Sequence, residues 1–406
     1  MKLPLSLLVL TLNEAKTLPF CLAPLKDHVS EILVCDTGSA DGTPRIAKRH
    51  GATVFFRPPV KDGRLDRARN FLIEKAAQPW ILFIDADEQI ARKSIPLLRA
   101  LILRPKADTY YFPRRNYSDT LPVLYEWHPC RREYPREERF SRCHGYYETP
   151  RICLFRNQPR LRYEVPVHDS LLPAIQRHGI CIQPADLPIH HFEFHKGMGH
   201  HIEKHRFYAK ILKRLIRRVP AYTPAYFSVV RDLIASGSNP KETLRFAQRL
   251  TAKASHSDDA WTLRGVVEME AGRYLEAEAH FKKAIRLEKS ARNLCLLGWL
   301  YLKKGDYSLS EKILKESLGK SPLQPLTLNL LGIARERTGE IKKALRSFSE
   351  AGRIHPGYAE SFYNQAVIRG RLGDLRGSRK NYERSRQLFS AMRMWRIESG
   401  VGGSAS

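Results

Sequence analysis

Three carboxylates directly follow a hydrophobic run near residue 80. The stretch WILFIDADE places Asp85, Asp87 and Glu88 after the apolar residues Trp80–Ile84, which have the length and content of a buried strand. An acidic residue in this position often only caps the next helix. Three carboxylates in four positions repel one another unless a cation joins them. Oxygen ligands two residues apart suit Mg²⁺ or Mn²⁺ with a phosphorylated substrate, so the spacing favours a metal site.

The elements that must position these carboxylates alternate between strand and helix. Expected strands cover residues 5–12, 31–36, 53–56 and 80–84, and expected helices cover 15–25, 43–51 and 65–76. Thr43 is the expected N-cap of the second helix, with Pro44 in its first position. This alternation predicts an α/β fold with a parallel sheet covered on both faces, whose polar strand ends meet at one edge.

The first residues, MKLPLSLLVLTLNEA, also imitate a short signal peptide. Their apolar stretch is much shorter than the roughly 20 residues that span a bilayer, and Pro4 and Ser6 interrupt it. The stretch Asn13–Lys16 makes a poor cleavage site. We therefore favour a first buried strand that ends in a polar loop.

The composition is that of a globular and strongly basic chain. The 406 residues suffice for two or three domains, and 43% of them are apolar, which argues against disorder. The net charge of +27 suggests a nucleic-acid binder, but no recognition motif supports that class, so we expect no nucleic-acid partner. Seven dispersed cysteines without a CxxC pair predict reduced thiols and a cytoplasmic location. The spacing of His128, Cys130, Cys143 and His144 is poor for zinc.

Four motifs in the first ninety or so residues carry a resemblance to a known family. TLNEA, VCDTGSADGT, ARN and WILFIDADE, in this order, resemble glycosyltransferase family 2 with the GT-A fold, in particular its lipopolysaccharide-core and peptide glycosyltransferase branch. Later stretches are similar to further landmarks of that family: RICLFR at 151–156, VHD at 167–169 and IHHF at 189–192. The resemblance covers roughly residues 3–210 and fades between 110 and 145, where the acceptor would be recognised.

The resemblance implies an inverting transfer from a nucleotide-sugar donor, expected to be UDP-linked, to a saccharide, lipid-linked or peptide acceptor. It places the nucleotide against the ends of the first two strands, at Thr11, Asn13, Glu14 and Asp36. It assigns Asp85 to the ribose or the metal, and Asp87 and His191 to a Mn²⁺ or Mg²⁺ ion that bridges the diphosphate. The departing diphosphate gains negative charge, which a divalent cation offsets.

Two further residues have a functional and a plain interpretation. Asp169 is the candidate base that takes the acceptor's proton, with Glu148 next in line, but an Asp near a loop can equally bond the backbone. Arg69 is expected to meet the diphosphate, or to form a surface ion pair with Asp66.

Histidines and a basic helix follow this region. The pairs His191/His195 and His201/His205 stand four apart, yet they lack the Glu of an HExxH site, so a dedicated zinc site is disfavoured. Residues 202–219 form an amphipathic helix whose apolar stripe is Tyr208, Ile211, Leu212, Leu215, Ile216 and Val219. We favour packing between domains for this helix over contact with anionic lipid, which would give peripheral membrane binding.

Beyond Pro220 the sequence repeats with a period near 34 residues. Gly265, Gly298, Gly332 and Ala366 are 33, 34 and 34 residues apart. Large residues follow each by sixteen positions: Phe281, Leu314, Phe348 and Tyr382. This pattern resembles tetratricopeptide repeats, in which paired helices form a solenoid that binds a protein partner or mediates self-association.

These observations predict a GT-A transferase domain over residues 1–200 and a basic connecting helix over 201–221. A repeat domain follows over 222–395, with clear repeats from about 258 and a degenerate first pair, and we expect a disordered tail over 396–406. The alternative is a non-catalytic repeat scaffold with a vestigial transferase domain. Intact Asn13, Asp36, Asp85 and Asp87 speak against it.

Overall fold

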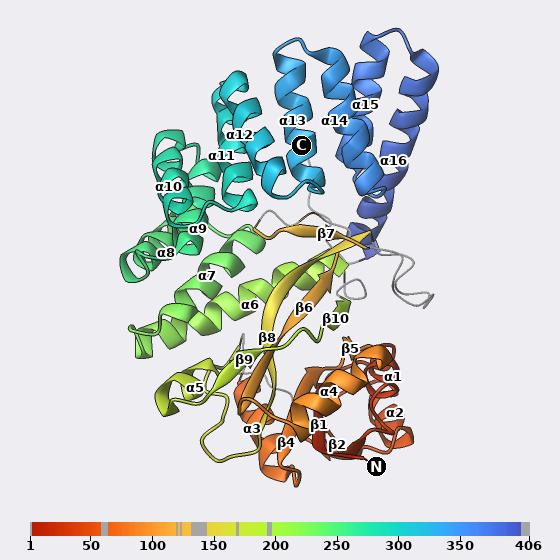
Figure 1. Cartoon of the computed structure of the whole chain (residues 1–406), viewed down its shortest axis with the longest axis vertical. Helices are drawn as coiled ribbons and strands as arrows, with labels where there is room; N and C mark the ends of the chain where they lie inside the picture. The colour runs from red at the N-terminus through yellow and green to blue at the C-terminus, as the bar shows by residue number, and fades with distance from the viewer. Residues whose placement is uncertain are drawn as a thin grey trace. The chain divides into compact units, whose positions relative to one another are not determined.

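A computed structural model of the chain describes residues 2–57, 64–118, 121, 124–130, 144–167, 170–192 and 197–398, without the side chains of 197–201 and 390–398. The chain divides into two compact units. The α/β unit comprises Met1–Tyr117 and Glu148–Glu193, and the helical unit comprises Ser118–Tyr147 and Phe194–Ser406 (Figure 1). The segment 118–147, although it lies between two strands of the α/β unit in sequence, therefore folds with the helices.

The α/β unit is built on one mixed sheet. Its strands are β1 (Leu3–Thr11), β2 (Val29–Asp36), β3 (Thr53–Phe56), β4 (Trp80–Asp85), β5 (Glu88–Ile90), β6 (Thr109–Tyr117), β8 (Gly145–Arg156), β9 (Ile182–Pro184) and β10 (Ile189–Phe192). The order is β3-β2-β1-β4-β8-β6-β10-β5, with β9 paired to β6. Strands β1 to β4 are parallel, whereas β8 runs antiparallel to β4 and β5 antiparallel to β10.

Helices cover both faces of this sheet. They are α1 (Leu18–Leu22), α2 (Thr43–Arg49), α3 (Leu65–Lys75), α4 (Ile95–Leu103) and α5 (Leu172–His178), with a short 3₁₀ turn at Arg92–Ser94. On one face Leu7 of β1 belongs to a core with α1, α2 and α4. On the other face the adjacent Leu8 belongs to a core with α3 and α5. Successive side chains of a strand point to opposite faces, so β1 is apolar on both faces apart from Ser6 and the terminal Thr11.

The expected strands and helices of the first ninety residues are confirmed, including the strand interpretation of the N-terminal run. Two local expectations are wrong. The first helix is much shorter than residues 15–25, and the second begins at Thr43 with Gly42 as its N-cap. The Thr43 hydroxyl instead accepts a hydrogen bond from the backbone N–H of Glu14, at 2.8 Å, and so joins two loops.

The helical unit contains a short strand, β7 (Trp127–Pro129), and eleven helices among the described residues. The helices are α6 (Gly197–Arg218), α7 (Thr223–Ala235), α8 (Pro240–Lys253), α9 (Asp258–Glu270), α10 (Tyr274–Leu287), α11 (Ala291–Lys304), α12 (Tyr307–Lys320), α13 (Pro325–Arg337), α14 (Ile341–Ile354), α15 (Ala359–Arg371) and α16 (Leu375–Glu398). Helices α9 to α16 form the four predicted repeat pairs, and α7 with α8 forms the irregular first pair (Figure 1).

Glycines set the close approach of the two helices in each repeat. A Cβ atom on Gly332 would come within 2.4 Å of the Phe348 ring, and the equivalent glycines of the two preceding repeats are equally tight. In the last repeat Ala366 carries this Cβ atom, and its partner Tyr382 is 51% exposed, whereas Phe348 is fully buried. The repeat period therefore reflects a steric requirement for a small residue.

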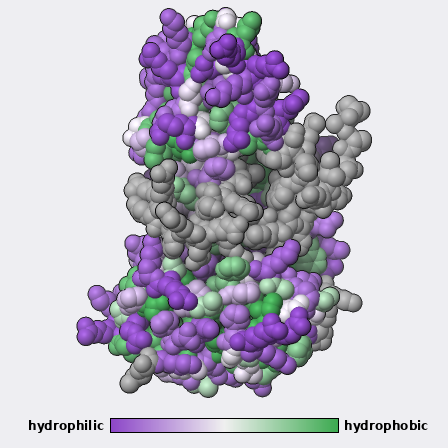
Figure 2. Space-filling view, turned by 90° about the vertical axis from the view of Figure 1, so that its right-hand side faces the viewer, coloured by the Kyte–Doolittle hydropathy of each residue, from purple (hydrophilic) through white to green (hydrophobic). Residues whose placement is uncertain are grey.

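The apolar stripe of the amphipathic helix is largely buried within the helical unit. Ile211, Leu212 and Ile216 of α6 are buried, whereas Val219 lies beyond the helix and is exposed. This burial, against helices of the same unit, argues against a lipid-facing stripe, while packing between domains stays a prediction. Among the described residues no helix is both long and apolar enough to cross a membrane. Hydrophilic side chains cover most of the face of each unit that Figure 2 shows.

Candidate active site

The loops after β1 and β2 are joined by hydrogen bonds at the carboxyl edge of the sheet. Asp36 is buried, and its carboxylate accepts hydrogen bonds from the backbone N–H of Ser39 at 2.8 Å and of Gly38 at 3.1 Å. It also accepts from the hydroxyls of Ser39 at 2.6 Å and Thr11 at 3.0 Å. Four donors on one carboxylate fix the loop that follows β2 against the end of β1.

Asn13 and Glu14 hold the neighbouring loop. Asn13 has a positive φ of 57°, a conformation that Asn tolerates better than most residues. Its side-chain oxygen accepts from the backbone N–H of Ala40 at 2.8 Å, while its own side chain remains exposed at the sheet edge. The buried carboxylate of Glu14 accepts from the Thr17 hydroxyl at 2.6 Å. The structure thus brings together all four residues assigned to the nucleotide.

Asp85, at the end of β4, is held by two arginines. Arg69 of α3 donates to Oδ1 at 2.8 Å, and Arg151 of β8 lies 3.0 Å from Oδ2. Arg69 is buried and its guanidinium lies over the Phe83 ring at 4.6 Å. Arg69 therefore does not form the surface ion pair with Asp66 that was one of its two expected roles, because Asp66 pairs with Arg64 at 2.6 Å.

The same arginines determine the charge of Asp85. Burial by itself would favour the neutral carboxyl, but the charges of Arg151 and Arg69 outweigh it and lower the pKa of Asp85 from its usual value. Glu88 is also buried, and it pairs with Arg151 at 3.3 Å and with Arg114 of β6 at 3.4 Å. Asp85 and Glu88 are thus paired with three arginines from α3, β6 and β8.

Asp87 faces His191 of β10. The His191 Nε2 atom lies 3.7 Å from Asp87 Oδ1, and its Nδ1 atom is 2.9 Å from the side-chain oxygen of Asn116. Because that oxygen only accepts, Nδ1 must donate, which leaves the Nε2 lone pair directed toward Asp87 in the neutral ring. A carboxylate oxygen and an imidazole nitrogen form a donor pair that fits Mn²⁺ or another divalent cation.

Of the three expected metal ligands, Asp87 and His191 are the pair whose side chains face each other. Among the described residues no group of three or more His, Cys, Asp or Glu side chains has metal-binding geometry. Asp85, the third ligand expected from the resemblance, directs its oxygens to arginines instead. The cysteines that the structure describes are free thiols, and Cys143 lies outside the described residues.

Asn116→Leu is expected to weaken divalent-cation binding about 10- to 100-fold, the usual effect of losing the partner that orients a ligating histidine. Without the acceptor at Nδ1, the His191 ring loses its fixed tautomer. The measurement is the Mn²⁺ concentration that gives half-maximal thermal stabilisation of the variant. Asn116→Asp, which keeps an acceptor, should retain more affinity than Asn116→Leu; equal affinity in all three chains would contradict this role.

The histidines around residue 200 do not act as one group. His190, next to His191 on β10, is fully buried and bonds the Tyr117 hydroxyl at 2.7 Å, and burial lowers its pKa to about 3. His205 belongs to the helical unit and lies 2.8 Å from Asp232. His195 and the side chains of His200 and His201 lie outside the described part of the chain.

The candidate base cannot be placed from the structure, because His168 and Asp169 lie outside the described residues. Glu148, the next candidate, is exposed and pairs with Arg115 at 2.9 Å. Sequence reasoning counted Glu88 only as a member of the acidic triplet and gave no role to Arg114, Asn116 or Arg151. Arg151 alone carried a signal, as the first residue of the RICLFR stretch.

The fold and the edge of the sheet define an α/β domain of the GT-A transferase type followed by a tetratricopeptide-repeat solenoid. Residues 6–160 match the model of glycosyl transferase family 2. Residues 244–291 and 295–359 match a model of the tetratricopeptide repeat. The resemblance drawn from the sequence motifs is thereby confirmed for both parts.

Three curated proteins show the same two similarities separately. The chain is 35% identical over 176 residues to a TPR repeat-containing protein of Synechococcus elongatus, covering 42% of this chain and 37% of that protein. It is 34% identical over 104 residues to the lipopolysaccharide core biosynthesis glycosyltransferase LpsC of Rhizobium meliloti, covering 25% and 38%. It is 35% identical over 86 residues to the glycosyltransferase SunS of Bacillus subtilis, covering 21% and 20%. The chain thus spans less than two fifths of each relative, and the matches support a glycosyltransferase.

Proposed function

We propose that the α/β unit transfers a sugar, with inversion, from a nucleotide-sugar donor to a saccharide, lipid-linked or polypeptide acceptor. The observation that carries this proposal is the Asp87–His191 pair, which lies at the end of the sheet where Asp85 is also fixed. A UDP-linked donor is the expectation from the family resemblance. The similarity to the glycosyltransferases LpsC and SunS adds support for a glycosyltransferase.

The residues of this edge divide into binding and positioning groups. Asp87 and His191, with Asp85 beside them, would hold Mn²⁺ or Mg²⁺, which supplies positive charge to the departing diphosphate. Thr11, Asn13, Glu14 and Asp36 give the nucleotide a rigid edge, because their loops are already joined by hydrogen bonds. Arg69, whose side chain is buried, holds the Asp85 carboxylate in place by a hydrogen bond.

The acceptor's proton requires a base on the face opposite to the leaving group. We propose Asp169 for this role on its place in the VHD stretch, with Glu148 as the alternative. The Glu148 carboxylate, held by Arg115, remains exposed. We also propose that the repeats bind a polypeptide partner or a second copy of the chain, as their solenoid architecture permits.

Thermal unfolding with a panel of nucleotide sugars, with and without Mn²⁺, tests the proposal. We expect one nucleotide diphosphate sugar to stabilise the chain only in the presence of the cation. At a ligand concentration of about 100 Kd the stabilisation is about 2.7 kcal/mol. If no nucleotide sugar stabilises the chain under either condition, the vestigial-domain scaffold is the better account.

A further inference from the structure

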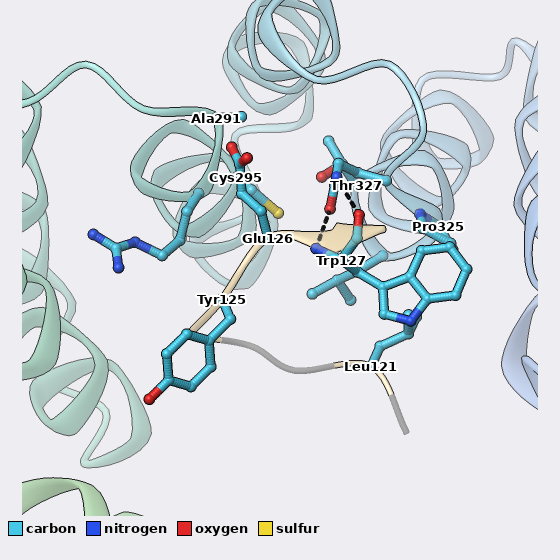
Figure 3. Close-up of a pocket in the computed structure, with 11 residues that line it drawn as sticks. Leu121, Tyr125, Glu126, Trp127, Ala291, Cys295, Pro325 and Thr327 are labelled. Carbon is cyan, nitrogen blue, oxygen red and sulfur yellow. Dashed lines mark hydrogen bonds between the residues drawn. The ribbon is translucent and has the colours of Figure 1, made fainter. Parts of the chain in front are cut away.

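Between β6 and β8, the described residues 124–130 include the short strand β7 and contact the helical repeats. β7 pairs antiparallel with the start of β8, with Trp127 opposite Tyr147 and Pro129 opposite Gly145. Residues of this segment line one pocket together with the N-terminal ends of α11 and α13 (Figure 3). All of these residues belong to the helical unit.

The repeats contact the backbone of this segment through side chains. The Gln324 amide donates to the carbonyl oxygen of Trp127 at 2.8 Å and accepts from its N–H at 3.2 Å, the dashed pair in Figure 3. Arg292 donates to the carbonyl oxygen of Leu124 at 3.3 Å. Asp258 and Asp259 form ion pairs with the Arg292 guanidinium at 2.9 and 2.7 Å, so contacts within the repeats orient this donor independently of the segment.

The side chain of Trp127 anchors the same segment. It is 2% exposed and packs in a cluster with Leu328, Ala351 and Ile354 of α13 and α14. Its ring stacks on the buried His355, with centroids 5.0 Å apart. On the segment's own side, a Cβ atom on Gly145 would come within 2.0 Å of the indole, so only glycine fits there.

Both ends of the segment lead directly into strands of the candidate active site. Ser118 follows two residues after Asn116, which orients His191. At the other end β8 continues from Gly145 to Arg151, which holds Asp85 and Glu88. Within the stretch where the family resemblance fades, and where it implies that the acceptor is recognised, Leu124, Trp127 and His144 therefore contact the repeats.

We infer that the repeats position the acceptor side of the transferase by holding residues 124–130 and 144–147, with Gln324 and His355 as positioning residues. The acceptor part of this inference rests on the proposed function; the holding of the segment does not. A segment that only fills the groove would pack in the same way. The two roles differ in one consequence: the release of a segment that only fills the groove would leave the ends of β6 and β8 unchanged.

Hydrogen exchange of the full chain, followed by mass spectrometry, separates these two roles. In Gln324→Ala we expect exchange in residues 124–130 to become at least about tenfold faster, because the backbone of Trp127 loses both partners. We also expect faster exchange in residues 114–117 and 148–151. Gln324→Glu keeps the acceptor for the Trp127 N–H and should give an intermediate effect. Gln248→Ala, an exposed glutamine of α8, is the matched control.

A second variant keeps the test independent of Gln324. Trp127→Ala should show the same two regions of faster exchange, and a synthetic peptide of residues 119–130 should bind this variant but not the wild-type chain, whose groove is filled. Faster exchange confined to 124–130, or unchanged exchange in both variants, would overturn the inference. Because these readouts need no sugar donor, their failure is distinct from a failure of the nucleotide-sugar screen.

Discussion

Asp87→Ala is expected to reduce sugar transfer at least about 100-fold, equivalent to about 2.7 kcal/mol of transition-state stabilisation. The Asp87 carboxylate is the oxygen donor that faces Nε2 of His191, and a cation held there would offset the charge of the departing diphosphate. The variant should also lose the Mn²⁺-dependent part of its stabilisation by the nucleotide sugar. Its melting temperature without ligand should not change, because the backbone oxygen that accepts from Phe192 remains.

Asp186→Ala provides the matched control for this change. Asp186 is an exposed aspartate of the same unit, so its removal alters the net charge equally without touching the sheet edge. The two variants should therefore differ in transfer rate and in Mn²⁺ response, but not in melting temperature. Full transfer by Asp87→Ala, or undiminished transfer by the wild-type chain in excess EDTA, would refute the metal assignment.

Arg151→Met should destabilise the α/β unit by about 3–5 kcal/mol, the usual cost of leaving a buried charge without its partner. Arg151 contacts both Asp85 and Glu88. In its absence the fully buried Glu88 side chain keeps the more distant ion pair with Arg114, at 3.4 Å. Chemical denaturation of the variant near pH 7 measures the loss.

The pH dependence gives this prediction a second readout. The folded-state pKa of Asp85 is lowered by Arg151 and Arg69, so its ionisation contributes stability above the unfolded pKa of about 3.9. That contribution is lost as the pH falls through the folded-state value. Arg151→Met should therefore lose less stability than wild type between neutral pH and the region below about pH 4.

Two further variants distinguish the ion pairs from general effects of charge. Arg151→Lys keeps the charge but cannot span both carboxylates, so its free energy of unfolding should lie between those of wild type and Arg151→Met. Arg160→Met removes an exposed arginine near the end of β8 and should leave stability within about 0.5 kcal/mol of wild type. If Arg160→Met loses as much stability as Arg151→Met, the ion pairs of Arg151 are not the cause of the loss.

Local sequence patterns were sufficient for the first half of the α/β unit and for the repeats. Four buried strands with polar ends define where the loops of Asp36 and Asp85 must meet, because parallel strands bring their carboxyl ends to one edge. The spacing of Gly265, Gly298 and Gly332 predicted the helix pairs because each glycine faces a large residue sixteen positions later. In both cases the residues that form the pattern lie within a single strand or within a single repeat.

The remainder depends on contacts that no local pattern specifies. Asn116 and His191 are 75 residues apart and become neighbours only through the pairing of β6 with β10. Arg151 meets Asp85 because β8 joins the sheet antiparallel to β4, and no local residue pattern indicates the direction of that strand. The membership of 118–147 in the helical unit was equally inaccessible, since its partners are helix ends far along the chain.

The pairing of Trp127 with Gln324 also affects how the chain folds as it is made. These residues are 197 positions apart, so at about 5–20 residues per second the ribosome needs roughly 10–40 s to supply the second after the first. During that interval Trp127 and Leu121 lack the helices that later cover them. The α/β unit can close its sheet early, but Trp127 meets Gln324 only after the third of the four regular repeats has begun to emerge, which until then leaves Trp127 and Leu121 exposed to chaperones or to aggregation.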